Sequence, residues 1–112
     1  EGLDELSCEG SSVIKSIGQA RLPDRVTPQD AGLPAHPLTA IRGGDARHNA
    51  AALRALLQGE PGPYRDAVLL NAAAALMVAD RAASLAEGVE EAAEVLDNGL
   101  ANTLLDCWIA HT

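Results

Sequence analysis

The alternation of apolar and polar positions is interrupted between Asp66 and Asp80, where Asn71 is the only polar residue. A surface helix places polar residues at every third or fourth position, whereas a helix that is apolar all round is typically buried on every side. The run is shorter than the roughly 20 apolar residues that a membrane-spanning helix needs. The pattern therefore predicts a central, buried helix over residues 63–80.

Two features of this helix lead to further predictions. The alanines at positions 72–75 keep it thin, so neighbouring elements can approach it closely. A polar side chain that is buried without hydrogen-bond partners costs about 1–3 kcal/mol, so Asn71 must find partners. Two interpretations are open: Asn71 ties the helix to a neighbouring loop, or it contacts a ligand.

A second helix is predicted over residues 45–59. Asp45 is a good N-cap, because its carboxylate can accept from free backbone N–H groups, and Gly59 is a typical helix stop. Gly43 and Gly44, directly before the helix, suggest that its N-terminus could instead cradle a phosphate. The Asp45 carboxylate would then be aimed at the same N–H groups, so we favour capping.

Two more helices are predicted near the C-terminal end, over residues 84–98 and 100–109. Ser84 and Glu87 have the spacing of a capping box at the start of the first. The apolar side chains predicted to be buried are Leu85, Val89, Ala92, Ala93 and Leu96 in the first helix, and Leu104, Leu105, Trp108 and Ile109 in the second.

The segment before these helices predicts a small β-hairpin within residues 1–26. The strand candidates are residues 12–17 and 20–26, joined by a turn at Gly18, and Pro23 limits the second to a sheet edge. A single helical turn is expected over residues 27–30. The expected fold class is therefore mostly α with a small β-hairpin.

The chain has 112 residues, enough for one domain, and a net charge of −8. The charge argues against nucleic acid as a partner, because phosphate binding needs clustered Lys and Arg. Cys8 and Cys107 are expected to be buried or half-buried reduced thiols in the cytosol, and a disulfide between them is the alternative. We expect a cytoplasmic protein, because residues 1–11 lack the apolar core of a signal peptide.

The adjacent carboxylates of Asp4 and Glu5 are the residues that attract a chemical hypothesis. Two carboxylates in a loop can hold Mg²⁺, with water and substrate phosphate completing its shell. On composition alone, such a pair is more often a solvated surface feature. The histidines have no metal-binding spacing: His36 is expected to be solvated, and His48 to be structural or solvated. No catalytic residue is predicted.

Four segments together resemble one enzyme family. They read G-L-D-E-L-S at residues 2–7, R-G-G-D-A-R-H-N-A-A-A-L-R-A-L-L at 42–57, G-P-Y-R-D-A-V-L-L-N-A-A-A-A-L at 62–76, and S-L-A-E-G-V-E-E-A-A-E-V-L-D-N-G at 84–99. Their content, order and spacing resemble the C-terminal portion of the anthranilate phosphoribosyltransferases, which act in tryptophan biosynthesis.

The resemblance implies an α/β domain of the nucleoside-phosphorylase and phosphoribosyltransferase type. It also implies that Asp4 and Glu5 hold Mg²⁺, which bridges to the pyrophosphate of phosphoribosyl pyrophosphate. The reaction joins anthranilate to the ribose C1 and displaces pyrophosphate. The resemblance also implies that the intact enzyme is a homodimer, and we expect neither a membrane nor a nucleic acid as a partner. The family's phosphate loop and anthranilate-contacting residues would lie upstream, so we expect these 112 residues to be a C-terminal piece that is inactive alone.

The chain departs from the family pattern after Ser7, where residues 8–12 read C-E-G-S-S in place of T-x-G-P-T. Two other functions remain open. One is a non-catalytic, nucleic-acid-binding relative of the same fold, against which the acidic charge and the retained Asp4 and Glu5 both count. The other is a stand-alone helical interaction module, although the chain begins without a methionine, which leads us to expect an absent N-terminal part.

Overall fold

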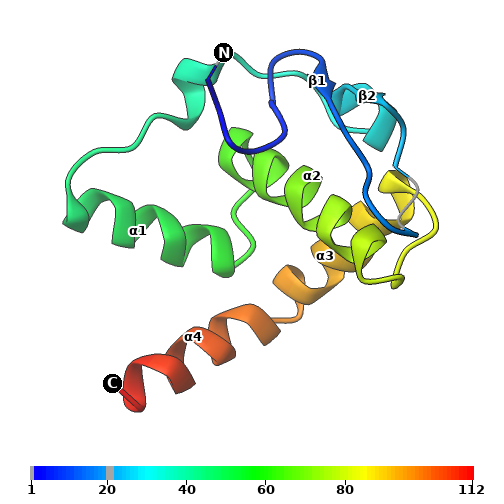
Figure 1. The fold of residues 1–112 in the computed structure, drawn as a ribbon. Coiled ribbons are helices and arrows are strands. Elements are labelled where there is room, and N and C mark those ends of the chain that lie inside the picture. Colours follow the sequence, from blue (N-terminus) through cyan, green and yellow to red (C-terminus); the bar gives the residue numbers. More distant parts are fainter. Residues whose placement is uncertain (1, 20–21) are drawn as a thin grey trace.

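The structure is a computed structural model that describes residues 2–19 and 22–112. These residues form two short strands, two 3₁₀ helices and four α-helices (Figure 1). In chain order the elements are β1 (Ser12–Val13), β2 (Arg25–Val26), η1 (Pro28–Ala31), η2 (Leu38–Ile41), α1 (Ala46–Leu57), α2 (Pro63–Val78), α3 (Leu85–Asp97) and α4 (Leu100–Ala110).

Each α-helix begins and ends within two residues of its predicted bounds. The predicted caps explain this agreement for α1 and α3. The Asp45 carboxylate accepts from the His48 N–H at 2.8 Å, and the Ser84 hydroxyl accepts from the Glu87 N–H at 3.1 Å. Caps satisfy backbone donors that have no partner inside the helix, so they fix where a helix starts. The mostly helical fold class is confirmed.

The β-hairpin is confirmed, but it is shorter than predicted. β1 and β2 are antiparallel, with Ser12 opposite Val26 and Val13 opposite Arg25. One further backbone hydrogen bond, from the Ile14 N–H to the Asp24 carbonyl at 2.8 Å, extends the pairing. The predicted start of the second strand at residue 20 lies outside the described residues. The predicted helical turn at 27–30 is confirmed as η1.

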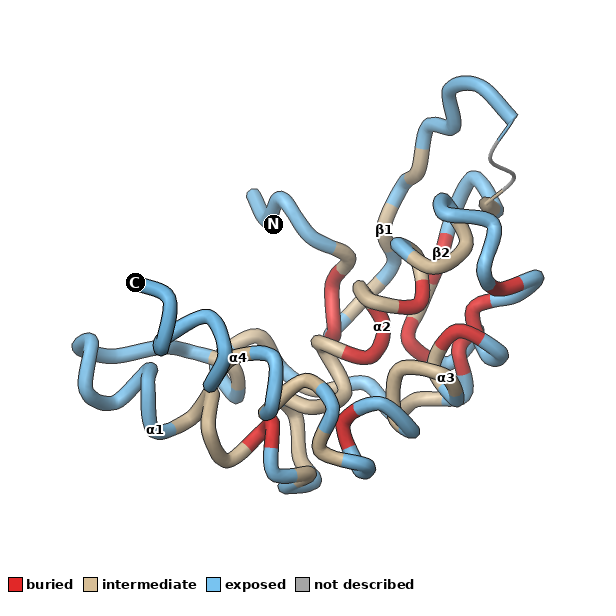
Figure 2. Tube along the Cα trace, turned by 90° about the horizontal axis from the view of Figure 1, so that it is seen from below, coloured by how far each residue is buried: buried red, intermediate tan, exposed pale blue. Residues whose placement is uncertain are grey.

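The buried core lies along the side of α2 that faces α3 and the hairpin (Figure 2). One cluster of buried side chains joins the hairpin, η1, α2 and the start of α3, and a second joins α1, α2 and α3. The members of the first are Val26, Ala31, Leu70, Ala73 and Leu85, and those of the second are Leu56, Leu57, Leu69 and Leu96. α2 is therefore the central helix, as predicted.

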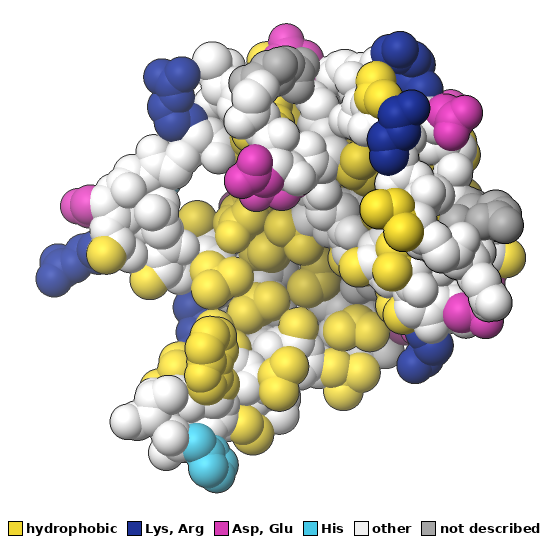
Figure 3. Space-filling view, viewed as in Figure 1, with side chains coloured by type: hydrophobic (Ala, Val, Ile, Leu, Met, Phe, Trp, Pro, Cys, Tyr) yellow, Lys and Arg dark blue, Asp and Glu magenta, His cyan; other side chains and the backbone are white. Residues whose placement is uncertain are grey.

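The prediction that α2 is buried on every side is wrong for the described part of the chain. Ala75, Val78 and Ala79 are exposed. An open apolar hollow of about 540 Å³ lies along α2, α3 and the start of α4, lined by residues that include Val68, Leu76 and Val95. Figure 3 shows the apolar side chains gathered on this face. The core elements cover only one side of α2, so its opposite side stays open.

The predicted burial of α4 is also wrong. Leu104, Trp108 and Ile109 are 70%, 68% and 55% exposed, and only Leu105 is half-buried. α4 extends away from the rest of the molecule and meets it through α1 and α3 (Figure 1). An apolar stripe on a helix shows which face can be buried, but burial also needs a neighbour, and no described element covers Leu104, Trp108 or Ile109.

None of the helices in the described ranges is long and apolar enough to cross a lipid bilayer. This agrees with the expectation that the apolar run in α2 is too short for a membrane span.

Candidate functional site

The predicted acidic pair lies on a loop at the N-terminal end of the described chain. Asp4 and Glu5 are both exposed. They line a mainly polar hollow of about 410 Å³ together with the rest of residues 2–7, residues 11–13 and Asn71. The loop bends and forms no strand within residues 2–9.

Asn71 fastens this loop to the central helix. Its Oδ1 accepts a hydrogen bond from the Leu6 N–H at 2.8 Å, and its Nδ2 donates to the Leu6 carbonyl at 3.1 Å. The same Nδ2 donates to the Ala67 carbonyl, one turn earlier in α2, at 3.0 Å. The interpretation of Asn71 as a tie between the helix and a neighbouring loop is confirmed.

Ser7 makes a second anchor directly after Leu6. It is buried, and its hydroxyl accepts from the N–H groups of Glu9 and Gly10 at 3.1 and 3.2 Å. Its own N–H donates to the Ser12 hydroxyl at 2.9 Å. The altered segment 8–12 therefore starts with a tight, internally bonded turn that leads into β1. The acidic pair lies before both anchors.

The acidic pair has the donor chemistry that Mg²⁺ prefers. Within the described ranges, neither carboxylate forms a hydrogen bond or ion pair with the protein, so both are available to a ligand. Those ranges contain no group of three or more His, Cys, Asp or Glu side chains placed to hold a metal ion. Mg²⁺ is commonly held by one or two carboxylates, with water and substrate phosphate as its other ligands. Asp4 and Glu5 therefore fit an Mg²⁺ site that a substrate completes.

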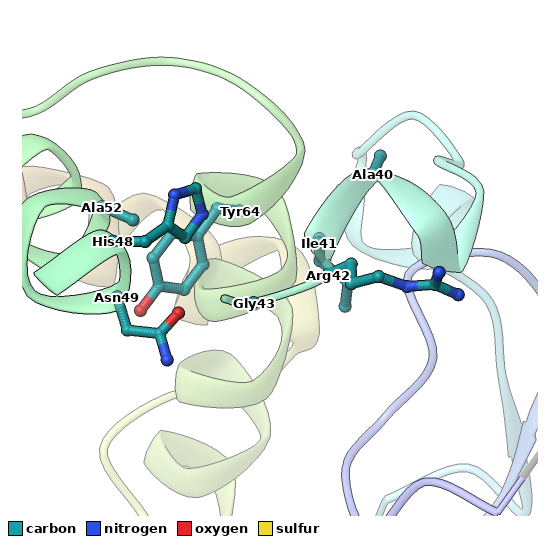
Figure 4. A pocket seen from close by; sticks show the side chains of 8 residues that line it. All are labelled: Ala40, Ile41, Arg42, Gly43, His48, Asn49, Ala52 and Tyr64. Atoms are coloured by element: carbon teal, nitrogen blue, oxygen red, sulfur yellow. The ribbon is translucent and has the colours of Figure 1, made fainter. Parts of the chain in front are cut away.

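A second hollow, of about 280 Å³, lies at the start of α1 (Figure 4). Residues 40–43 form one wall, and His48, Asn49 and Tyr64 are among the residues that form the other. Figure 4 shows the Arg42 side chain pointing away from these three side chains. The positive charge of Arg42 is therefore not directed at a ligand in this hollow.

The chain itself occupies the Gly44 N–H and carbonyl and the His48 N–H at the start of α1. The Asn49 side chain accepts from the Gly44 N–H at 2.9 Å and donates to the Gly44 carbonyl at 3.1 Å. The Asp45 carboxylate accepts from the His48 N–H. The prediction that Asp45 caps this helix is therefore confirmed.

The prediction that His36 is solvated is wrong. Its side chain is only 21% exposed, and Nε2 lies 2.7 Å from the Asp66 Oδ2 in the first turn of α2. The His36 N–H donates to the Cys8 carbonyl at 2.8 Å. The loop folds back onto α2, and this brings together two residues that are 30 positions apart. Sequence spacing alone gave no signal for the pair.

Cys8 and Cys107 form no disulfide, so the alternative of a disulfide is wrong. Cys8 is buried as expected, but Cys107 is exposed because it lies on the uncovered helix α4.

Two ion pairs join helices near the open face. Arg65 holds Asp97 through two hydrogen bonds of 2.8 and 3.1 Å, and the guanidinium keeps the pKa of the Asp97 carboxyl below its ordinary value of 3.8. Arg54 contacts Asp106 at 2.7 Å and donates to the Asn102 Oδ1 at 2.8 Å, which links α1 to α4.

Comparisons with known proteins agree with the resemblance found in the sequence. Residues 1–102 match the sequence model described as "Glycosyl transferase family, a/b domain". The chain is 63% identical over 98% of its length to the anthranilate phosphoribosyltransferase of Novosphingobium aromaticivorans, and 59% identical over 99% to that of Sphingopyxis alaskensis. It spans 34% of the length of each of these relatives.

A solved structure gives the same result. The crystal structure of anthranilate phosphoribosyltransferase from Thermus thermophilus matches 77% of the chain, with a TM-score of 0.73 and 46% identity. The match covers 26% of that protein. Sequence and fold thus point to the same group of proteins, of which this chain spans about a third.

Proposed function

Because the chain belongs to the glycosyl transferase family with an a/b domain, we propose that it forms part of an anthranilate phosphoribosyltransferase of tryptophan biosynthesis. The whole enzyme would join the amino group of anthranilate to the ribose C1 of phosphoribosyl pyrophosphate and release pyrophosphate. The curated relatives that match almost the whole chain at 63% and 59% identity carry this name, and this supports the proposal.

In this function, Asp4 and Glu5 hold Mg²⁺ at the polar hollow. The observation that carries the assignment is that both carboxylates are exposed and that no described protein group neutralises them. Mg²⁺, when bound, neutralises negative charge on the departing pyrophosphate. The carboxylates hold the ion and transfer no proton. α2 and the hairpin supply the scaffold that carries the acidic loop.

We assign no substrate-binding residue to this chain. It spans about a third of the relatives that it matches, so phosphoribosyl pyrophosphate and anthranilate are expected to bind largely through other parts of the enzyme. The 112 residues alone are accordingly expected to show no turnover.

The test is an anthranilate-consumption assay on the full-length protein that contains these residues, with phosphoribosyl pyrophosphate and Mg²⁺. Asp4→Asn and Glu5→Gln should each raise the Mg²⁺ concentration needed for half-maximal turnover by about tenfold or more. Glu94→Gln is the matched control, because Glu94 is an exposed carboxylate on α3, away from the hollow. A wild-type protein that consumes no anthranilate would contradict the proposed reaction.

Two further properties belong to the same proposal. The whole enzyme is expected to be a cytoplasmic homodimer, as the family resemblance implies, and light scattering of the full-length protein would test the dimer. The alternative of a nucleic-acid-binding relative is disfavoured by the net charge of −8. A mobility-shift assay with single- and double-stranded DNA should therefore show no complex.

A further inference from the structure

We propose that Asn71 is a positioning residue, which acts through Leu6 to hold Asp4 and Glu5 where they can bind the metal ion. This inference rests on the proposed function, because it concerns the same acidic pair. It assigns a role in metal affinity to a side chain that lies on the central helix and belongs to neither carboxylate.

The first argument is the geometry of the tie. One planar amide group contacts both backbone polar atoms of Leu6, accepting from its N–H at 2.8 Å and donating to its carbonyl at 3.1 Å. Two hydrogen bonds from one rigid group fix both the position and the orientation of the Leu6 backbone. Glu5 is the preceding residue and Asp4 the one before it, so the fixed point lies directly beside the acidic pair.

The second argument is that the amide itself is held in place. Nδ2 also donates to the Ala67 carbonyl at 3.0 Å, so both of its hydrogens are used. Ala67 lies in the same helix, one turn before Asn71 and shortly before the buried residues Leu69 and Leu70. The tie is therefore anchored on the helix that carries much of the buried core, and Asn71 has no donor left for a ligand.

The third argument is that the carboxylates depend on this anchor. Asp4 and Glu5 are exposed and make no hydrogen bond or ion pair of their own within the described ranges. The backbone therefore fixes where the two side chains start, and no other described contact restricts them. Loss of the tie would let the loop move, and the two carboxylates would have to be ordered when the ion binds, which weakens binding.

The experiment compares Asn71→Ala with Asn102→Ala in the full-length protein. Asn102 is a matched control, because it is also a half-buried helical asparagine whose Oδ1 accepts one hydrogen bond, from Arg54 at 2.8 Å, but it lies on α4. The first readout is the affinity for Mn²⁺, used as a paramagnetic probe for Mg²⁺ and measured by water-proton relaxation without substrates. Asp4→Asn serves as the reference for loss of the site.

We expect Asn71→Ala to weaken Mn²⁺ binding by about 10-fold, the effect typical of removing an outer-shell partner, and Asn102→Ala to leave it unchanged. The Mg²⁺ concentration for half-maximal turnover should shift in the same way. Unchanged affinity in Asn71→Ala, with affinity lost in Asp4→Asn, would overturn the positioning role and leave the proposed function intact. Equal losses in Asn71→Ala and Asn102→Ala would also overturn it, because they would indicate general destabilisation.

Hydrogen exchange gives a second readout that needs no metal. The Leu6 amide should exchange faster in Asn71→Ala, while amides in α3 keep their protection. Asn71→Asp is the back-up variant if the alanine does not fold, because aspartate is similar in size and keeps the acceptor for the Leu6 N–H but removes both donated hydrogen bonds. Unchanged Leu6 exchange together with unchanged Mn²⁺ affinity in Asn71→Asp would contradict the proposal. A failed anthranilate assay of the wild-type protein, in contrast, concerns the reaction and not this tie.

Discussion

Gly88 in α3 lies directly against Ala73 in α2. A β-carbon added to Gly88 would come within 2.8 Å of both the Cα and the Cβ of Ala73, and Ala73 is completely buried. The two helices can approach this closely because one contributes no side chain at the contact and the other only a methyl group. The small residues at 72–75 predicted such an approach, and Gly88 is the small residue that faces them from α3.

Gly88→Ala is expected to destabilise the protein. The added methyl group meets backbone atoms, which cannot move aside cheaply, so overpacking should cost about 1–3 kcal/mol. Over most of this range the cost exceeds the gain of roughly 1 kcal/mol that alanine normally gives over glycine inside a helix. Urea unfolding would measure the difference.

Ala86→Gly is the control for that experiment, because Ala86 is an exposed position in the same helix. It should show only the helix-propensity cost of roughly 1 kcal/mol. A Gly88→Ala protein that is more stable than the wild type would mean that the two helices are farther apart than described.

The His36–Asp66 pair is expected to contribute about 1 kcal/mol to stability. Both side chains are mostly covered, at 21% and 20% exposure, and their nitrogen and oxygen atoms are 2.7 Å apart. A double-mutant cycle with His36→Ala and Asp66→Asn, measured by urea unfolding, isolates the interaction between them. Additive effects of the two changes would show that the pair does not couple the loop to α2.

The Arg65–Asp97 pair predicts a pH dependence. Arg65 lowers the pKa of Asp97 below 3.8 in the folded protein, so folding favours the ionised carboxylate. The stabilisation is therefore present above pH 3.8 and disappears as the pH falls through the lowered folded pKa. Wild type should have a slightly higher Tm than Asp97→Asn at pH 7, and the difference should disappear once the pH has fallen below the lowered folded pKa of Asp97. The Asp97 side chain is 56% exposed, and solvent screens the ion pair, so the expected difference in Tm is small.

Thermal unfolding followed by circular dichroism at several pH values would check this. Glu94→Gln, at an exposed carboxylate without an ion pair among the described residues, should run parallel to wild type over the same range. A gap between wild type and Asp97→Asn that widens on acidification would have the wrong sign for this pair.

The uneven burial of the helices predicts a contrast between two leucines in the 112-residue chain. Leu70 is 1% exposed and Leu104 is 70% exposed. Leu70→Ala should cost about 2–5 kcal/mol, because it opens a cavity in the core. Leu104→Ala should change stability by less than about 0.5 kcal/mol. Comparable losses in urea unfolding would mean that α4 is packed against something in solution.

The helices could be predicted because their signals are local. Asp45 and Ser84 mark where helices start, and glycine marks where they stop, so bounds follow from a few adjacent residues. Burial was harder to predict. Trp108 lies on an apolar helix face, and the sequence says that this face can be covered but not whether a neighbour reaches it.

At the candidate site, too, local features could be predicted from the sequence and long-range contacts could not. That Asn71 needed a partner followed from its apolar surroundings, but its partner, Leu6, is 65 positions away, and local spacing carries no information on such a contact. The hypothesis for Asp4 and Glu5 gained its specificity from the family resemblance, because an acidic pair by itself is common on protein surfaces. His36 and Asp66 had no distinguishing pattern before the fold placed them together.

The tie between Asn71 and the acidic loop uses only backbone atoms of Leu6. The amide therefore does for this loop what a neighbouring strand does in a sheet, and it does not depend on which side chain stands at position 6. Mutational scanning should accordingly find that the tie tolerates most residues there, apart from any cost to packing. Proline is the exception, because it lacks the N–H that donates to Asn71. The side chain at position 6 can therefore change while the loop keeps its shape, provided that Asn71 is retained.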